Sequence, residues 1–306
     1  MTTIKILDAD TPVKLEWLRS FLAIVDTGGF TRAAKKLRMS QPAVSTHIHE
    51  LEKNLGAELF EKFGSRTRMT ASGEAIVGEA RSIIQGVRHL KVMAQESETG
   101  IGGLLTVGAS TTPGNYVLPR VLAEFERLYP AVRTKLLLGN STRILERLTA
   151  NEVELGAIGV HPPSDEFVSR PLVDDEIVVF APAGHPLARR RGEVPLADLA
   201  GQRFILRESD SATRRLTEGW LASRKFAPSV MELDCPETVK RAVAAGLGLG
   251  ILTKFAISPE AGERGFAVLR VAGFPIRRSL YLVHLRRKRL TRTMSAFLEL
   301  LKSLKK

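Results

Sequence analysis

The chain has 306 residues, of which 44% are hydrophobic and 25% charged, and it carries a net charge of +12. This length predicts two or three compact units, and the composition is unlike that of a disordered protein. A single cysteine excludes an internal disulfide framework and a cysteine-based metal cluster, and we expect Cys235 to be small and buried. No apolar run reaches the ~18 residues that span a membrane, and residues 1–13 lack a signal-peptide core, so a cytoplasmic protein is expected.

The positive charge is distributed unevenly along the chain. Residues 14–68 carry ten Lys/Arg against six Asp/Glu, whereas residues 277–306 carry ten against one. The basic C-terminal segment is interpreted as a solvated face, with contact to DNA or to an acidic partner as the alternative. The net charge alone therefore assigns no nucleic-acid function.

Residues 1–13 are interpreted as an extension, and the first predicted helix runs from about Leu15 to Gly28-Gly29. A short helix over residues 32–37 follows, with Thr31 as its N-cap. After a turn, Ser40 caps another helix and Pro42 lies in its first turn, where the missing N–H costs nothing.

This third helix has two distinct faces. Its apolar residues recur at helical spacing and predict one buried stripe: Val44, Ile48, Leu51 and Leu55. Its outer face carries uncharged hydrogen-bonding groups: Gln41, Ser45, Thr46, His47 and His49. A helix of this kind suits the reading of base edges in a major groove, although an ordinary helical hairpin is the alternative.

A β-hairpin is predicted after Leu59-Phe60, with its tip at residues 63–66. Arg66 and Arg68 alternate with Thr67, so both arginines are expected on one side of a strand, facing phosphates or the minor groove. A charged edge that only prevents sheet pairing is the alternative.

A long helix is predicted from Thr70 to about Gln95. Its apolar residues recur every three or four positions: Ile76, Ala80, Ile83, Val87, Leu90 and Ala94. At ~1.5 Å per residue it extends about 39 Å, too long for a small domain, so packing against a second copy is expected. Packing onto its own C-terminal domain is the alternative. A dimer would place two recognition helices on two related half-sites of double-stranded DNA.

Strands and helices alternate beyond a hinge at residues 96–103, which predicts an α/β region with a mostly parallel sheet. Two lobes are expected, lobe I from residues 104–174 and 267–306 and lobe II from residues 175–266. The chain would cross between them near residues 173–176 and again near residues 264–266, which leaves a cleft.

Polar residues are expected to line this cleft. Ser110, Thr111 and Thr112 follow one strand and precede a helix, and Asn140 and Thr142 do so after the next strand. That edge of an open α/β sheet binds ligands, although all of these residues could simply be helix caps. Further candidates come from the other lobe: Arg207, Glu208, Ser211, Thr213 and Thr238.

The string from Leu18 to Gly73 contains AA-x-x-L-x-x-SQPAVS, E-x-x-L-G-x-x-LF and T-x-S-G, and closely resembles the DNA-binding domain of LysR-type transcriptional regulators. LPRVLAEFERLYPAV, LLLGNSTRILERL, EIVVFAPAGHPLA and VKRAVAAGLGLGILT resemble the family's effector domain. Three positions depart from the family's pattern: Gly29, Lys62 and Ala212 stand where Ser, Arg and Gly are commoner.

The resemblance implies an α plus α/β chain. It comprises a winged helix-turn-helix at residues 14–70, a linker and dimerisation helix at 71–95, and a two-lobed effector domain of the type II periplasmic-binding-protein fold at 104–306. The DNA-binding residues it implies are Thr31, Arg32, Ser40, Gln41, Pro42, Ser45, Thr46, His47, His49, Lys62, Arg66 and Arg68. It also implies a homodimer or homotetramer, a small polar or anionic effector, and RNA polymerase as a partner.

The expected function is sequence-specific transcriptional regulation controlled by a metabolite, with no cofactor, metal or catalytic residue. An α/β enzyme is the first alternative, but the sequence has no nucleophile elbow, no Gly-rich phosphate loop and no H-E-x-x-H motif. An architectural DNA-binding protein without an effector is the second alternative.

Overall fold

The computed structural model describes residues 13–63, 66–190, 192–257 and 265–303, without the side chains of residues 62, 63, 66, 88, 89, 91–99 and 303. The chain divides into two compact units. The first ends at Ala94 and the second begins at Gln95, apart from Thr149–Glu152, which group with the first. Of the predicted extension, residues 1–12 lie outside the described part, as does the centre of the predicted hairpin tip.

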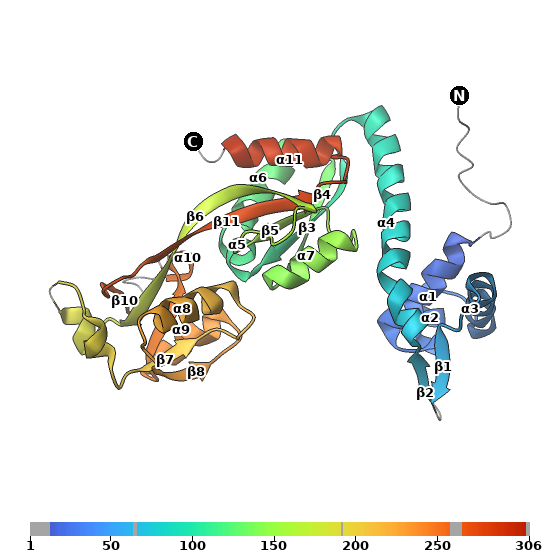
Figure 1. Ribbon diagram of the computed structural model, residues 1–306. Coiled ribbons are helices and arrows are strands. Elements are labelled where there is room, and N and C mark those ends of the chain that lie inside the picture. Colours follow the sequence, from blue (N-terminus) through green and yellow to red (C-terminus); the bar gives the residue numbers. More distant parts are fainter. Residues whose placement is uncertain (1–12, 64–65, 191, 258–264, 304–306) are drawn as a thin grey trace. The chain divides into compact units, whose positions relative to one another are not determined.

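The N-terminal unit is a winged helix-turn-helix (Figure 1). It consists of α1 (Leu15–Thr27), α2 (Phe30–Leu37), α3 (Gln41–Leu55), the antiparallel strands β1 (Phe60–Phe63) and β2 (Arg66–Met69), and α4 (Ala71–Thr99). Its core closes around fully buried Phe21, Val44, Leu51 and Leu59. Three helices and a hairpin thus share one apolar centre, as the spacing predicts.

The residues that cap these helices are the ones that the sequence predicts, with one exception. Gly28 ends α1 in the left-handed conformation (φ 71°), which glycine adopts without strain, and Ser40 accepts a hydrogen bond from the Ala43 N–H (3.3 Å). The expected cap at Thr31 is wrong, because α2 begins at Phe30 with Gly29 as its N-cap. The expected buried stripe of α3 is also shorter, since Leu55 is exposed.

Helix α4 begins where Thr70 accepts a hydrogen bond from the Gly73 N–H (3.0 Å). It continues to Thr99, so the first half of the expected hinge is helical. Within the described part of the chain, no helix is long and apolar enough to cross a bilayer.

The apolar seam of α4 changes its role along the helix. Ala80 is buried in the core of the winged domain, and Ile76 packs against that core. Ala80 is therefore covered by its own chain rather than free for a second one, whereas Ile76 is only partly covered. Ile83 and Leu90 are 42% and 66% exposed, and the side chain of Ala94 lies outside the described part. Among the seam residues whose side chains the structure describes, Ile83 and Leu90 are thus the exposed ones.

The second unit is built on one nine-stranded sheet of order β4-β3-β5-β11-β6-β9-β7-β8, with β10 paired to β6. The strands are β3 (Gly103–Ser110), β4 (Val132–Gly139), β5 (Leu155–Ile158), β6 (Phe167–Pro182), β7 (Arg203–Leu206), β8 (Ser229–Glu232), β9 (Leu249–Thr253), β10 (Phe266–Leu269) and β11 (Ile276–Leu285). The helices are α5 (Thr111–Tyr116), α6 (Leu118–Leu128), α7 (Ser141–Thr149), α8 (Ala212–Ser223), α9 (Pro236–Ala244), α10 (Lys254–Ile257) and α11 (Arg292–Ser303), with 3-10 turns at Pro186–Arg189 and Leu196–Leu199.

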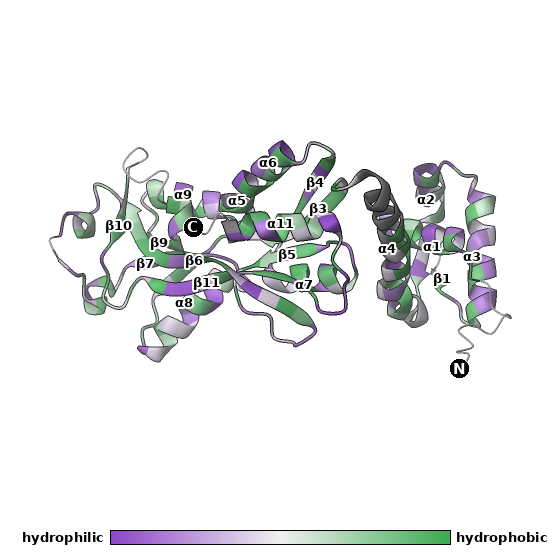
Figure 2. Ribbon diagram, turned by 90° about the horizontal axis from the view of Figure 1, so that it is seen from above, coloured by the Kyte–Doolittle hydropathy of each residue, from purple (hydrophilic) through white to green (hydrophobic). Residues whose placement is uncertain are grey.

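Two long antiparallel strands, β6 and β11, run from one lobe into the other (Figure 1). Lobe I has α6 and α11 on one face of the sheet and α7 on the opposite face. In lobe II, α9 and α10 pack on one face, and the fully buried strand β9 lies between β6 and β7. Figure 2 shows apolar residues along β7 and β9, as expected for strands covered on both faces.

The boundary between the lobes differs from the expectation at one of its two crossings. Residues 173–176, where the first crossing is expected, lie inside β6, just before the residues of β6 that pair with β9. The second was expected near residues 264–266, but β10 pairs with Val179–Pro182 of lobe II. The chain returns to lobe I only along β11. Residues 267–269 were expected in lobe I, but β10 belongs to lobe II because it pairs with β6 there.

Two glycines of α4 test the packing of the winged domain. A Cβ at Gly73 would lie 2.4 Å from the Leu59 carbonyl oxygen, whereas a Cβ at Gly78 would meet nothing within 4 Å. We expect Gly73→Ala to destabilise the domain by about 1–3 kcal/mol through overpacking. Gly78→Ala should stabilise it by up to about 1 kcal/mol through helix propensity. Urea unfolding of both variants measures the difference, and equal effects would contradict the close packing at Gly73.

Candidate functional site

The exposed face of α3 presents the hydrogen-bonding groups that the sequence predicts. Gln41, Ser45, Thr46 and His49 are exposed, as is Pro42. A hollow of about 1120 Å³ lies beside this face, and its lining includes residues from α3, the turn before α2, and the hairpin. The β1–β2 hairpin, which is the wing of this domain, therefore borders the same hollow as α3.

Internal hydrogen bonds fix several of these side chains. The Thr31 hydroxyl donates to Oε1 of Gln41 (3.0 Å), and the Thr46 hydroxyl donates to the Pro42 carbonyl (3.0 Å). Nη2 of Arg32 donates to the Gly28 carbonyl (2.7 Å). Gln41 is thus held with its amide N–H₂ group free to donate, while Arg32 folds back onto its own chain.

His47 does not share the outer face with its neighbours. Its Nδ1 lies 2.8 Å from the hydroxyl of Ser20, a buried residue of α1. The expectation of an outward-facing His47 is therefore wrong, because one ring edge is used to join α3 to α1. On the wing, Arg68 is exposed, whereas the side chains of Lys62 and Arg66 lie outside the described part.

The effector unit contains a second candidate site, a small cavity between the two lobes. Lobe I contributes the ends of β3, β4 and β5, and lobe II contributes the end of β7 and the start of α8. The lining residues are Ser110, Thr111, Thr112, Asn140, Ser141, Gly159, Arg207, Glu208, Ser211, Ala212, Thr213 and Arg278. Of the predicted effector residues, Thr142 and Thr238 are absent from this lining, and both are exposed.

Arg207 is the first of two guanidinium groups at this cavity. Its side chain is only 4% exposed, and Nε and Nη2 each donate to a different carboxylate oxygen of Glu208, both at 2.6 Å. Nη2 also donates to the hydroxyl of Thr111 on the other lobe (3.3 Å). A buried cation is therefore held at the end of β7 by a paired carboxylate.

Arg278 is the second guanidinium, and sequence reasoning missed it. Nε donates to Asp175 (2.8 Å), directly opposite on β6, and Nη2 donates to the Thr112 hydroxyl (3.2 Å). Burial lowers the pKa of Arg278 from its usual value, and the adjacent Asp175 carboxylate opposes that shift. Asp175 is itself fully buried and accepts a further hydrogen bond from Thr253 (2.5 Å).

Two polar contacts join the lobes around the cavity, Arg207 to Thr111 and Asn140 to Asp210 (2.5 Å), and Arg278 on the crossing strand β11 bonds to Thr112 of lobe I. A Cβ at Gly159 would lie 3.3 Å from the Cβ of Ala212 across the cleft. The cavity measures about 20 Å³, space for about one water. Sites for drug-sized ligands measure ~300–1,000 Å³, so the cavity in this arrangement of the lobes is too small for a metabolite.

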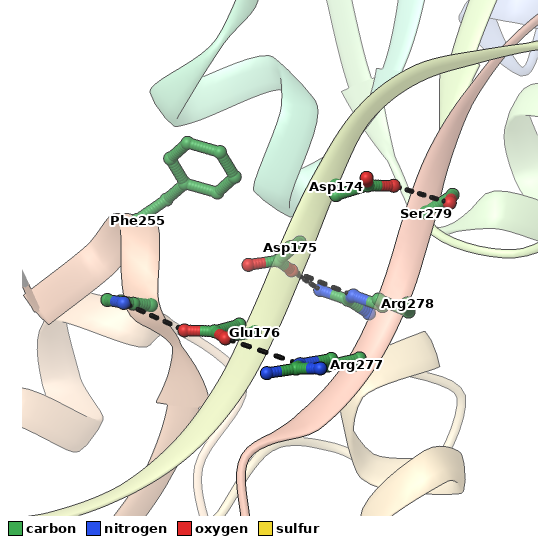
Figure 3. A pocket seen from close by; sticks show the side chains of 8 residues that line it. Asp174, Asp175, Glu176, Phe255, Arg277, Arg278 and Ser279 are labelled. Atoms are coloured by element: carbon green, nitrogen blue, oxygen red, sulfur yellow. Dashed lines mark hydrogen bonds and ion pairs between the residues drawn. The ribbon is translucent and has the colours of Figure 1, made fainter.

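The strands β6 and β11 also border a larger cavity of about 910 Å³. Figure 3 shows cross-strand pairs beside it, Asp174 with Ser279 and Asp175 with Arg278, while Glu176 pairs with Arg277 and Lys254. Lys254 lowers the pKa of Glu176 by hydrogen bonding. Arg278 borders both cavities.

Cys235 is exposed at the N-terminus of α9, so the expectation that it is buried is wrong. Among the residues that the structure describes, no group of three or more His, Cys, Asp or Glu side chains could hold a metal ion.

The pair between Asp175 and Arg278 can be tested by removing its anion. Asp175→Asn should destabilise the effector unit by about 3–5 kcal/mol, because a buried guanidinium loses its counter-charge. Glu124→Gln, which breaks an exposed ion pair with Arg127 in the same unit, serves as the control and should leave stability unchanged. Thermal unfolding of both variants is the measurement, and similar melting temperatures would contradict the structural role of Asp175.

Comparison with known proteins identifies relatives of both units. Residues 15–74 match the family "Bacterial regulatory helix-turn-helix protein, lysR family", and residues 98–305 match "LysR substrate binding domain". The RuBisCO operon transcriptional regulator of Allochromatium vinosum is 35% identical over 288 residues, covering 94% of this chain and 95% of its own.

Solved structures agree with these matches. The regulatory domain of CcmR from Synechocystis PCC6803, in complex with 2-PG, is 30% identical with a TM-score of 0.63, covering 67% of this chain and 98% of its own. A full-length OxyR variant from Pseudomonas aeruginosa has the same fold, with a TM-score of 0.71 at 22% identity, over 95% of this chain and 93% of its own. The relatives are transcriptional regulators rather than enzymes, and this chain belongs to the LysR family of DNA-binding transcriptional regulators.

Proposed function

We propose that this regulator binds DNA as a dimer and is controlled by a small oxyanion, a carboxylate or phosphate compound, bound between the two lobes of its effector unit. One observation carries the effector proposal: two buried guanidinium groups, Arg207 and Arg278, border the same interlobe cavity. Arginine binds carboxylates and phosphates through paired N–H groups, and burial strengthens such bonds.

The rest of the lining suits a ligand with further polar groups. Hydroxyl groups of Ser110, Thr112, Ser141, Ser211 and Thr213 border the cavity and can donate or accept hydrogen bonds. The 30% identical CcmR domain, solved with 2-PG, supports an effector of this kind. A ligand that separates or reorients the lobes changes the regulator only through different affinities for its two arrangements.

The effector proposal is tested by calorimetry with 2-PG and a panel of small carboxylates and phosphates. Arg207→Met should weaken binding of any active compound at least about 100-fold, since a charge-assisted paired contact is lost. Arg127→Met, an exposed residue of lobe I, is the matched control and should leave affinity unchanged. Binding that is insensitive to Arg207 would place the effector elsewhere, and no binding by any compound would favour an architectural protein.

DNA reading is proposed for the exposed face of α3, and phosphate contact for the wing. Gln41, Ser45, Thr46 and His49 can reach base edges in a major groove, and Gln41 is already oriented by Thr31. Ser40 and Pro42 position the start of α3, while Lys62, Arg66 and Arg68 supply charge on the hairpin.

Two substitutions separate these roles. Ser45→Ala should cost about 1–3 kcal/mol on the preferred operator and little on unrelated DNA. Arg68→Ala should weaken binding to all sequences alike and reduce the dependence on salt by about one counterion. Titration of fluorescent operator and random duplexes at several salt concentrations measures both quantities. The proposed assignment fails if Ser45→Ala weakens both duplexes equally.

Dimerisation is proposed through the C-terminal half of α4, where Ile83, Val87 and Leu90 continue an apolar seam. Apolar side chains that form a continuous exposed row, rather than standing singly, mark protein–protein interfaces. RNA polymerase is the expected further partner on the promoter, and the cytoplasm is the expected location of a regulator of this kind.

The dimer is tested with Leu90→Glu, which introduces a charge into the proposed seam and should raise the dissociation constant by about tenfold or more. Leu55→Glu changes an exposed leucine of α3 outside the seam and should leave the association unchanged. Sedimentation velocity over a concentration series is the measurement. Equal association of the two variants would exclude this part of α4 from the interface.

A further inference from the structure

Glu208 places a carboxylate of the chain itself where an anionic effector would bind Arg207. Oε2 lies 2.6 Å from Nε of Arg207, and Oε1 lies 2.6 Å from Nη2. These bonds occupy one complete edge of the guanidinium, which is the geometry with which arginine recognises a carboxylate ligand. An external oxyanion and Glu208 therefore compete for the same two N–H groups.

The two partners differ in their freedom to separate. Arg207 is 4% exposed and also bonds to Thr111, whereas Glu208 is 24% exposed at the cavity. Within the described chain, the Glu208 carboxylate accepts hydrogen bonds from Arg207 alone. Glu208 can rotate towards solvent while Arg207 stays in place.

Arg278, the second guanidinium, cannot exchange its carboxylate partner for a ligand in the same way. Its counter-ion, Asp175, is fully buried and is held by Thr253 as well as by Arg278. Removing this carboxylate from Arg278 would leave a buried charge without its counter-ion, at high cost. The exchangeable position of the cleft is therefore Arg207.

We propose that Glu208 is an internal competitor that occupies the oxyanion position on Arg207 and must leave it before an effector binds. This inference rests on the proposed function, because it takes the interlobe cleft as the effector site. Because Glu208 is tethered next to Arg207, its effective concentration is high, so a simple anion that contacts only the guanidinium competes poorly. A metabolite that also bonds to the hydroxyl groups of Ser110, Thr112 and Ser141 has additional binding energy to displace it. Glu208 thereby selects metabolites against inorganic anions.

The test measures binding of inorganic phosphate, a probe of the guanidinium alone, to the full-length chain. Glu208→Gln removes the competing charge at constant size, so the half-saturating phosphate concentration should fall about tenfold or more. Glu218→Gln is the matched control, because Glu218 pairs with Arg214 on the same lobe but does not line the cavity. Glu208→Asp keeps the charge but shortens its reach and should give an intermediate affinity. If Glu208→Gln does not fold, the phosphate affinity of Glu208→Asp tests the inference in its place.

Unchanged phosphate affinity in Glu208→Gln, absence of phosphate binding to that variant, or an equal gain in Glu218→Gln would each overturn the inference. Calorimetry with 2-PG and the metabolite panel separates this failure from that of the proposed function. Arg207-dependent metabolite binding with no effect of Glu208→Gln would leave the effector site in place and remove the competitor. A gain in phosphate binding without any metabolite binding to the wild type would support competition by Glu208 on Arg207 and overturn the proposed metabolite effector.

Discussion

The buried ion pair between Asp175 and Arg278 is the interaction on which the geometry of the effector unit depends. It joins β6 to β11 where both strands pass from one lobe to the other, and it places a guanidinium at the edge of the cleft. Two buried charges stabilise little in themselves, because desolvation offsets most of their attraction. Their value lies in specificity of position, since neither residue can move alone without leaving an unpaired charge.

Local sequence patterns predicted the elements of the winged domain well. Ser40 at a helix start and Gly28 at a helix end act through neighbouring backbone groups, so their roles can be inferred from a few residues. Thr31 was assigned wrongly because glycine also serves as an N-cap, and nothing nearby distinguishes the two. The orientation of His47 depends on Ser20 in another helix, and such tertiary contacts cannot be read from helical spacing.

The lining of the cavity between the lobes could be predicted in part. Residues at strand ends, such as Ser110, Thr112 and Glu208, follow from the general placement of ligand sites in α/β sheets. Ser141 was passed over for Thr142 by one position, which on a helix turns the side chain about 100°. To predict that Arg278 lines the cavity, one must know the register of two strands about a hundred residues apart in the sequence. The facing runs Asp174–Glu176 and Arg277–Ser279 carried a signal, but only the pairing of β6 with β11 shows which charges meet.

The division of the α4 seam has a consequence for how the protein assembles. Ile76 and Ala80 complete the core of the winged domain from within one chain, while Ile83 and Leu90 remain uncovered. Folding of the DNA-binding domain and association of two chains through the proposed seam are therefore separable steps, and only the second depends on protein concentration. A cell that makes few copies of the regulator would contain folded monomers with low affinity for DNA. Occupancy of a two-half-site operator would then rise more steeply than in proportion to the amount of regulator made.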